Sequence, residues 1–453
     1  MSYLTRLASH YSALRSADIP EAVRLRARFA LADFLSVYIA GRAHGPLSEV
    51  LLQYADTKTG APDATVPFTD RRTDAETAAL VCAAIAHSVE LDDGHRYGTA
   101  HPSVAVIPPL LAVAQARPVA YRDLLAAIAV GYDWMLRTAR AINPAHLGRG
   151  FHSTSTAGTL GSAAAIARLM GFGSEDTANA VSIAALLSSG LQAMLHDRPE
   201  IKAFQVGRSA QSGLLAATMA ARGCGGPDRV YEGAHGWIAA MTDRFRQSDL
   251  VGGLGRRWEI MYSYTKLYPT CRHCHAPLDL VLDLHAQGLR PTQVRRIDIR
   301  TYTVAIDEVG GEQPPRSLQE AMFSLRYALA VALHEGELTA DSLVARLADE
   351  DVRDLVRRIG IATAPERDRQ YPESRGCDLR VWLNDDSVLQ RSAELPKGEP
   401  EKPLTPGEHR EKFYRLTRGC VPHSVAEALW KCILDSDDEA GTGPLFSLLV
   451  SSP

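Results

Sequence analysis

The helical spacing of apolar residues over the first 240 positions is the feature that most constrains the fold. Between residues 20 and 42, Val23, Ala27, Leu31 and Phe34 recur at intervals that place them on one face of a helix. The same spacing predicts helices at residues 75–90, 121–142, 154–170, 174–195 and 206–222. Several of these segments are rich in Ala, Gly and Ser, which lets helices approach closely. We therefore expect a tightly packed, all-helical core.

The pattern changes after about residue 268. Residues 295–307 and 377–395 alternate apolar and polar side chains, which predicts strands, with "NDDS" as a hairpin turn. Helical stretches at 317–334 and 340–359 lie between them, and a proline-rich connector leads to a helical tail. The chain is thus expected to be mainly α. We expect a helical domain over residues 1–265 with a C-terminal return over 405–453, and a smaller α+β domain over 266–404.

Composition excludes several classes of protein. The 453 residues carry a formal net charge of -4, with 46% hydrophobic and 23% charged residues, which are ordinary values for a globular protein. Nucleic-acid binding needs a basic face, and none is expected. The first 20 residues lack the apolar core of a signal peptide, and the apolar stretch at 78–91 is too short to span a bilayer. We expect a cytoplasmic protein with no nucleic-acid or membrane partner.

The stretch "YPTCRHCHAP" contains Cys271, Cys274 and His275 at the spacing of a c-type haem attachment site. It could equally be half of a zinc site. The chain has seven cysteines, an odd number, and no second C-x-x-C pair that would complete a tetrahedron of ligands. A metal- or haem-binding protein is therefore kept as an alternative to the enzyme described below.

Four segments combine titratable or cationic residues with helix ends. The first, "HSVELDDGHRYGTAHPS", offers Glu90, Asp92, Asp93, His95 and His101. Carboxylates this close raise one another's pKa, whereas neighbouring cations lower it. Such a cluster can set acid and base groups near neutral pH.

The second segment, "GRGFHSTSTAGTLGSAA", places His152 before good N-cap residues, and a helix N-terminus attracts anions. The third, at residues 198–213, supplies Lys202 and Arg208 beside a small-residue helix. Either cation could counter a substrate carboxylate.

The fourth segment, at residues 264–284, supplies Lys266, Arg272 and His273 before an apolar helix. If the four segments converge, they form a cationic pocket that contains titratable groups. Such a pocket suits abstraction of a proton next to a carboxylate, because positive charge stabilises the enolate-like intermediate.

In this order, the four segments resemble the MmgE/PrpD family, which includes 2-methylcitrate dehydratase, cis-aconitate decarboxylase and iminodisuccinate epimerase. The resemblance covers nearly the whole chain and includes "LADFLSVYIAGR", "ELDDGHRYGTAHPSVAVIP", "IKAFQVGRSAQSGLLAA" and "YTKLYPTCRHCHAPLD". It implies a large helical domain and a smaller α+β lid domain, with the active site in the cleft between them. It also implies a homodimer that needs no metal or organic cofactor.

The resemblance carries roles onto individual residues. The expected catalytic residues are Glu90, Asp92, Asp93, His101, His152 and Lys266. The expected substrate-binding residues are His95, Lys202, Arg208, Arg272, His273 and Tyr302, the last as the counterpart of a lid tyrosine. No residue is expected to bind a metal.

Two departures narrow the expected reaction. Decarboxylase-like members read roughly "DFDDT" followed by "THPS", whereas this chain reads "ELDDG" and "AHPS", with Cys271 where those members have a histidine. We expect an enzyme that abstracts a proton alpha to a carboxylate of a small polycarboxylate, giving elimination or epimerisation. The alternatives are a cis-aconitate decarboxylase-like lyase, a non-catalytic member, or a metal- or haem-binding protein that uses Cys271, Cys274 and His275.

Overall fold

The computed structural model describes residues 1–58, 62–196 and 200–450. The chain forms two compact units. The helical unit comprises Met1–Ser88, Asp92–Ser263 and Thr405–Pro453, and the mixed unit comprises Val89–Leu91 and Tyr264–Leu404. The assignment of Val89–Leu91 to the mixed unit was not anticipated, because these residues lie in the middle of the first motif.

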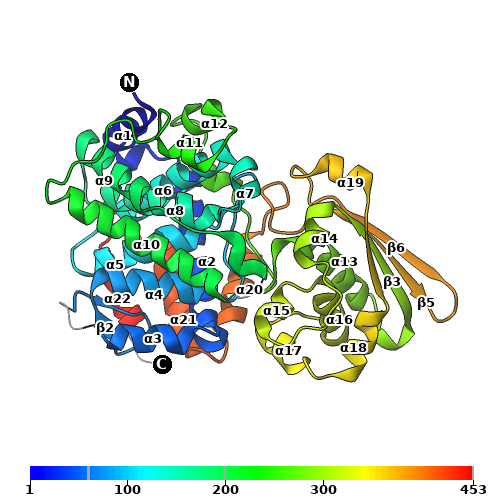
Figure 1. The fold of residues 1–453 in the computed structure, drawn as a ribbon. Coiled ribbons are helices and arrows are strands. Elements are labelled where there is room, and N and C mark those ends of the chain that lie inside the picture. Colours follow the sequence, from blue (N-terminus) through cyan, green and yellow to red (C-terminus); the bar gives the residue numbers. More distant parts are fainter. Residues whose placement is uncertain (59–61, 197–199, 451–453) are drawn as a thin grey trace. The chain divides into compact units, whose positions relative to one another are not determined.

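The helical unit is built around α2 (Glu21–His44), α4 (Ala75–His87), α5 (Pro102–Gln115), α6 (Tyr121–Ile142), α8 (Ser153–Leu169) and α10 (Ile201–Ala220). Helices α6, α8 and α10 lie side by side in Figure 1. Around them lie α1 (Tyr3–Ala13), α3 (Ser48–Asp56), α7 (Ala145–Gly148), α9 (Ser174–Leu187), α11 (Trp237–Met241), α12 (Gln247–Val251), α20 (Pro406–Thr417), α21 (His423–Asp435) and α22 (Gly443–Val450). A two-stranded ribbon, β1 (Ala64–Thr65) and β2 (Arg72–Thr73), completes the unit.

Small residues allow the central helices to cross closely, as the composition predicted. A Cβ atom on Gly161 of α8 would lie 2.5 Å from the Cβ of Met135 of α6. A Cβ on Gly213 of α10 would lie 2.4 Å from the Cβ of Ser162. Any larger side chain at these two crossings would push the helices apart, so the glycines set the separation of α6, α8 and α10.

Some helix bounds differ from those predicted. Helix α5 was not predicted, because Pro108 and Pro109 lie inside it and internal prolines usually break helices. Helix α9 ends at Leu187 rather than at residue 195. Helix α10 begins at Ile201, five residues earlier than expected, so Lys202 lies inside its first turn. The α6 bounds, Tyr121–Ile142, coincide with the prediction.

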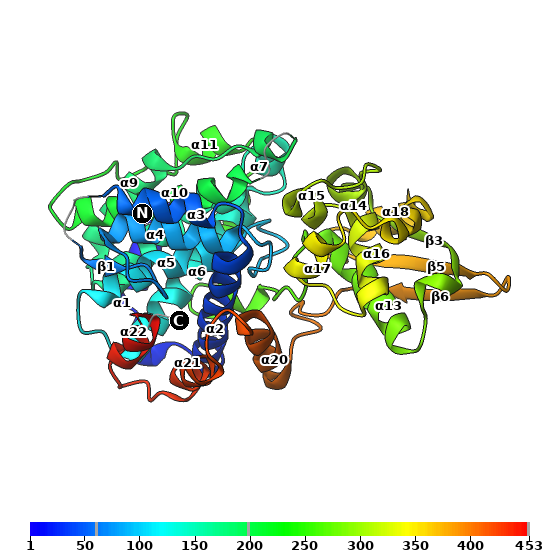
Figure 2. The same ribbon diagram turned by 90° about the horizontal axis from the view of Figure 1, so that it is seen from below.

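The mixed unit contains a four-stranded sheet in the order β4-β3-β5-β6. Its strands are β3 (Val294–Thr301), β4 (Ile359–Thr363), β5 (Cys377–Leu383) and β6 (Val388–Ala393). Strand β3 pairs parallel to β4 and antiparallel to β5. The helices are α13 (His275–Ala286), α14 (Thr303–Val309), α15 (Leu318–Met322), α16 (Leu325–Glu335), α17 (Ala340–Ala345), α18 (Glu350–Arg357) and α19 (Pro365–Gln370). Figure 2 shows α13 and α16 packed against the same side of the sheet.

The predicted hairpin at residues 377–395 is confirmed as β5 and β6. The predicted strand at 295–307 is only half right, because the chain turns into α14 after Thr301. The helix predicted at 340–359 is wrong as one element and divides into α17 and α18. The expected fold class, mainly α with a smaller α+β domain, is confirmed. No helix in the described part of the chain is long and apolar enough to cross a membrane.

Candidate functional site

The rings of His87, His101 and His152 lie close together in the helical unit, and Asp92 contacts the first two; we call these four residues the histidine cluster. His87 is the last residue of α4, and its Nδ1 lies 2.7 Å from Asp92 Oδ2. The His101 ring centroid lies 5.1 Å from that of His87, and the His152 ring stacks at 6.2 Å. The structure therefore brings the first and second predicted segments together, as the sequence analysis expected.

His101 precedes α5, whose first residue is Pro102. Its Nδ1 lies 2.8 Å from the backbone oxygen of Asp93 and 3.4 Å from Asp92 Oδ2. Both neighbours are acceptors, so Nδ1 carries a proton and the proton-exchanging atom of neutral His101 is Nε2. The exposed fraction of the His101 side chain is 15%, whereas that of His87 and Asp92 is 0%. His101 is thus the more accessible of the two histidines that share Asp92.

Asp93 holds the local backbone in place. Its Oδ1 accepts a hydrogen bond from the backbone N–H of Ser103 at the start of α5, and its Oδ2 accepts one from the Tyr132 hydroxyl at 2.9 Å. Burial raises the pKa of Asp93 to about 6, although the Ser103 bonds oppose the shift. The carboxyl group orients α5, and its own backbone carbonyl orients His101.

His152 is the residue before α8, and its backbone N–H donates to Gly190 at 3.1 Å. The neighbouring Thr154 hydroxyl accepts the backbone N–H of His101 at 3.1 Å. The start of α8 therefore fixes both His152 and His101.

Glu90 and Lys266 meet within the mixed unit. Lys266 Nζ donates to Glu90 Oε2 at 2.9 Å and to the Glu90 backbone oxygen at 3.0 Å, and both residues are buried. Glu90 has φ of 51°, a left-handed conformation that is costly for a residue with a Cβ and that occurs often at functional sites. Two predicted catalytic residues are thus brought together, although they lie far apart in the sequence.

A second group of titratable residues in the mixed unit contains Cys271, His273, Tyr302 and Glu308. His273 Nδ1 lies 2.5 Å from the Tyr302 hydroxyl, and its Nε2 lies 3.3 Å from Glu308 Oε2. Cys271 Sγ lies 3.5 Å from the same carboxylate oxygen. Burial raises the pKa of Cys271 to about 12. Burial would also raise the pKa of Glu308, but His273 and Cys271 bring it down to about 2.

Arg272 is a buried anchor of the mixed unit. Its guanidinium donates to Glu399 at 3.1 Å and to the Lys397 backbone oxygen at 3.0 Å, and it lies 4.6 Å above the Tyr264 ring. A further nitrogen lies 3.0 Å from His275 Nδ1. These contacts engage the guanidinium within the protein and explain its burial without a substrate.

The C-x-x-C-H pattern does not form one metal site. Among the described residues, the groups of ligand atoms close enough to share an ion are His87 with Asp92 and His101, and Cys271 with His273 and Glu308. Neither group contains Cys274 or His275. Among the described residues, the alternative in which Cys271, Cys274 and His275 share one ion is therefore wrong.

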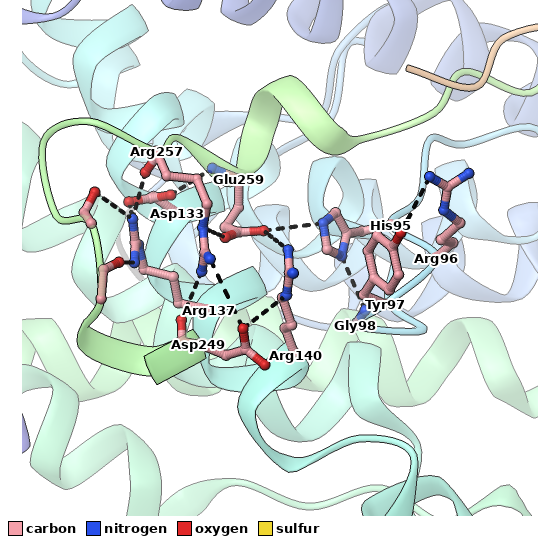
Figure 3. Close-up of polar contacts among 12 residues, drawn as sticks. His95, Arg96, Tyr97, Gly98, Asp133, Arg137, Arg140, Asp249, Arg257 and Glu259 are labelled. Carbon is pink, nitrogen blue, oxygen red and sulfur yellow. Dashed lines mark hydrogen bonds and ion pairs between the residues drawn. The ribbon is translucent and has the colours of Figure 1, made fainter. Parts of the chain in front are cut away.

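His95 belongs to a buried charge network in the helical unit, drawn in Figure 3. Its Nδ1 accepts the backbone N–H of Gly98 at 3.0 Å, so Nε2 carries the proton, and this nitrogen lies 3.2 Å from Glu259 Oε2. Arg257 and Arg140 reach the same carboxylate at 2.6 and 3.5 Å. The His95 side chain is fully buried and contacts protein groups at both ring nitrogens; its role in substrate binding stays a prediction.

The network continues through Asp133, which accepts the Glu259 backbone N–H at 2.6 Å and pairs with Arg137 at 2.7 Å (Figure 3). Arg140 also pairs with Asp249 at 3.1 Å. Burial would raise the pKa of Glu259, but the hydrogen bond from His95 and the two arginines bring it down to about 2. The network therefore holds Glu259 firmly in its charged form.

The third predicted segment forms the start of α10, which packs on α4 and α8, and its Gln205 backbone oxygen accepts the Ser155 hydroxyl at 3.0 Å. Lys202 is buried in the first turn of α10. Arg208 lies on the exposed face of the same helix and donates to Gln211. Arg208 thus has the surroundings of a surface residue.

Three buried polar residues were not singled out from the sequence: His87, Asp33 and Lys412. His87 was inside the first motif but was not singled out, although its spacing to Asp92 was a usable signal. Asp33 of α2 pairs with Lys412 of α20 at 2.6 Å, and both are buried within the helical unit. Asp33 acts electrostatically on Asp93, raising its pKa. No local pattern in the sequence marks that long-range pair.

The chain is similar to known proteins over most of its length. The MmgE/PrpD N-terminal domain matches residues 5–248, and the MmgE/PrpD C-terminal domain matches residues 268–438. A cis-aconitate decarboxylase-like protein, oryM, of Aspergillus oryzae is 26% identical over 467 residues, covering 98% of this chain and 96% of the relative. The cis-aconitate decarboxylase of Aspergillus terreus is 26% identical, covering 98% and 95%. The human cis-aconitate decarboxylase is 26% identical, covering 87% and 82%.

The two domain matches follow each other in chain order, and both units contribute residues to them. The first spans the histidine cluster, and the second spans the group around Cys271, His273 and Glu308. Because these matches cover most of the sequence, the chain belongs to the MmgE/PrpD family.

Proposed function

We propose that the protein is a lyase that transfers a proton at the carbon alpha to a carboxylate of a small polycarboxylate substrate. The observation that carries this proposal is the setting of His101. Its Nδ1 faces two acceptors at 2.8 and 3.4 Å, which directs proton exchange to Nε2, and it is partly exposed. An imidazole oriented by a carboxylate in this way is a common general base.

In the proposed elimination, His101 Nε2 removes the alpha proton, and the electron pair forms the new double bond as a β-hydroxyl group leaves. A second acid donates a proton to that hydroxyl, so that water is released. We assign this role to His152, whose ring stacks on that of His87. Asp92 stabilises the imidazolium that forms on His101. The predicted roles of Lys202 and Lys266 in binding carboxylates, and the predicted homodimer, remain part of this proposal.

Decarboxylation is the second candidate, because the relatives from Aspergillus terreus and human are named cis-aconitate decarboxylase. Here a carboxylate would leave as carbon dioxide, its electron pair would shift through the double bond, and a protonated histidine would protonate the alpha carbon. Cys271 stands where the resemblance places a histidine in decarboxylases, and we therefore rank elimination first.

The test is proton NMR of the full-length protein in deuterium oxide with 2-methylcitrate, citrate, cis-aconitate and iminodisuccinate. Elimination from a saturated hydroxy acid gives a vinyl or methyl shift without carbon dioxide. Decarboxylation of cis-aconitate gives a new vinyl product with carbon dioxide. Deuterium entry without loss of either group would mean epimerisation and would overturn the lyase assignment.

The matched variants are His101→Asn, which removes the exchanging nitrogen, and Arg15→Ala, which removes an exposed cation of the helical unit outside the predicted site segments. We expect His101→Asn to lower turnover by roughly 10²- to 10⁴-fold, the usual contribution of a general base. Arg15→Ala should leave turnover within about twofold, since surface changes are usually small. Turnover that survives in His101→Asn would contradict the assignment of the base.

A further inference from the structure

Cys271, His273 and Glu308 place three different metal-ligand atoms at one point of the mixed unit. Their Sγ, Nε2 and Oε2 atoms all lie within 4.8 Å of one another. The residues come from the loop before α13 and from α14, so two separate elements support the group. We propose that this group, named the Cys-His-Glu site, binds a divalent cation of the zinc type.

The spacing of the ligand atoms supports this assignment. Zinc binds sulfur at about 2.3 Å and nitrogen or oxygen at about 2.0 to 2.1 Å, in tetrahedral geometry. Two such ligands of one ion are therefore separated by about 3.3 Å for nitrogen and oxygen, and by about 3.5 Å for sulfur and oxygen. The observed separations are 3.3 Å from His273 Nε2 to Glu308 Oε2 and 3.5 Å from Cys271 Sγ to that oxygen.

The histidine cluster provides a contrast. There, His87 Nδ1 lies 2.7 Å from Asp92 Oδ2, which is an ordinary hydrogen-bond distance. Two ligands of one tetrahedral ion are held farther apart, at about 3.3 Å. The His87–Asp92 pair is therefore at a distance for sharing a proton, whereas both contacts of Glu308 Oε2 in the Cys-His-Glu site have the spacing of two ligands of one cation.

The surroundings of His273 prepare its Nε2 to bind a cation. A metal-bound histidine usually donates its other ring N–H to a fixed acceptor. The Tyr302 hydroxyl, 2.5 Å from Nδ1, is that acceptor, and it is fully buried and stacked on Tyr371 at 4.9 Å between ring centroids. The ring of His273 is thus held in one orientation.

The donor set identifies the class of cation. A thiolate favours zinc-type ions over magnesium or calcium, which prefer oxygen ligands. Cys271 as a thiolate and Glu308 as a carboxylate carry two negative charges, which balance one divalent cation. Cys271 and His273 are buried, but the Glu308 side chain is 33% exposed and provides a route of entry.

Three protein ligands leave the fourth tetrahedral position for water or for an oxygen of an anionic ligand. The site is therefore of the open kind rather than the closed, four-ligand structural kind. This inference does not depend on the proposed lyase activity, because it concerns binding of the ion alone.

The test is titration of the full-length, chelator-treated protein with Co²⁺, followed by competition with Zn²⁺. Tetrahedral Co²⁺ bound through a thiolate gives intense visible bands and a sulfur-to-cobalt charge-transfer band. We expect the wild-type protein to bind Co²⁺ with both signals and to lose both when Zn²⁺ is added. Failure of the wild-type protein to show them would overturn the proposal.

Three variants test whether the Co²⁺ signals come from the Cys-His-Glu site or from another cysteine. Cys271→Ser should abolish the charge-transfer band, and Glu308→Gln should retain that band while weakening affinity by at least about tenfold. Cys224→Ser removes an exposed thiol and should change neither. Circular dichroism checks that each variant is folded, and Glu308→Gln, on a partly exposed side chain, remains informative if Cys271→Ser is not. A charge-transfer band that persists in folded Cys271→Ser would overturn the assignment, as would undiminished affinity in Glu308→Gln.

Discussion

The helical unit contains two buried polar groups whose carboxylates have different kinds of partner. In the charge network of Figure 3, Asp133, Asp249 and Glu259 each face an arginine within 3.5 Å. In the histidine cluster, Asp92 instead faces the imidazoles of His87 and His101. Arginine stays protonated at all ordinary pH values, whereas histidine changes charge near neutrality. The first group fixes charges, and the second can exchange protons.

The pKa values of Glu259 and Asp93 shift in opposite directions. The pKa of Glu259 falls to about 2, because His95 and two arginines outweigh its burial. The pKa of Asp93 rises to about 6, because burial outweighs the hydrogen bonds from Ser103. Burial alone therefore does not decide the direction of the shift; the balance between burial and the partners of each carboxyl group does.

The largest expected effect on stability comes from a substitution in the charge network. Arg137→Met removes the cation beside buried Asp133, and we expect a loss of about 3 to 5 kcal/mol in the free energy of unfolding. His101→Asn should cost about 1 kcal/mol or less, because it removes one partly exposed hydrogen bond. Urea unfolding of both variants measures the contrast. Equal destabilisation by the two changes would contradict the distinction between the two regions.

The contributions of Asp93 and Glu259 to the pH dependence of stability should also have opposite signs. Folded Asp93 holds its proton up to about pH 6, above its ordinary pKa of 3.8. The folded state therefore binds more protons than the unfolded state between these values, and the free energy of unfolding falls as pH rises through this window. The expected fall is on the order of 3 kcal/mol. Asp93→Asn should remove it, as urea unfolding at pH 4 and pH 7 would measure.

Glu259 gives the reverse dependence. Its folded pKa of about 2 lies below its ordinary value of 4.5, so its stabilisation is present above pH 4.5 and is lost as pH falls toward 2. Glu259→Gln should flatten that acid limb while leaving the change between pH 4 and 6 in place. A variant that flattened both limbs would show that the two regions titrate as one.

The last prediction concerns His95. His95→Asn removes a partner of Glu259 and the acceptor of the Gly98 N–H, and we expect a loss of about 1 to 3 kcal/mol in stability. The KM for the substrate should stay within about twofold, because His95 is enclosed by protein contacts. A large rise in KM at unchanged stability would instead support the predicted role of His95 in substrate binding.

Much of the fold could be read from the sequence, because periodic apolar spacing acts over one or two turns of a helix. Helix α6 and the β5–β6 hairpin lie where their patterns placed them. Errors arose where local signals conflict with packing. The prolines inside α5 hid a buried helix, and the alternating pattern of β3 ran on into residues that form α14.

The candidate site was predicted in part. The motifs identified His101, which the structure brings to Asp92, and His152, whose ring stacks on that of His87. They also identified Glu90 and Lys266, which form an ion pair. The motifs did not distinguish His95, which contacts Glu259 in the charge network, from His101, which lies six positions further along the chain. The reason is that a charged loop residue looks the same in sequence whether it turns toward a reaction centre or toward a buried carboxylate.

By itself, the sequence determined several of the central helices, the hairpin, the family and most of the residues able to carry proton chemistry. These follow from spacing and residue type within short segments. Only the tertiary structure decided that His87 and His101 both contact Asp92. It also decided that His95 pairs with Glu259. Likewise, it placed the Cys271 thiol against Glu308. Such partners are chosen by the packing of elements that are distant in the chain, and the charge of the chosen partner then decides whether a buried group holds its proton or exchanges it.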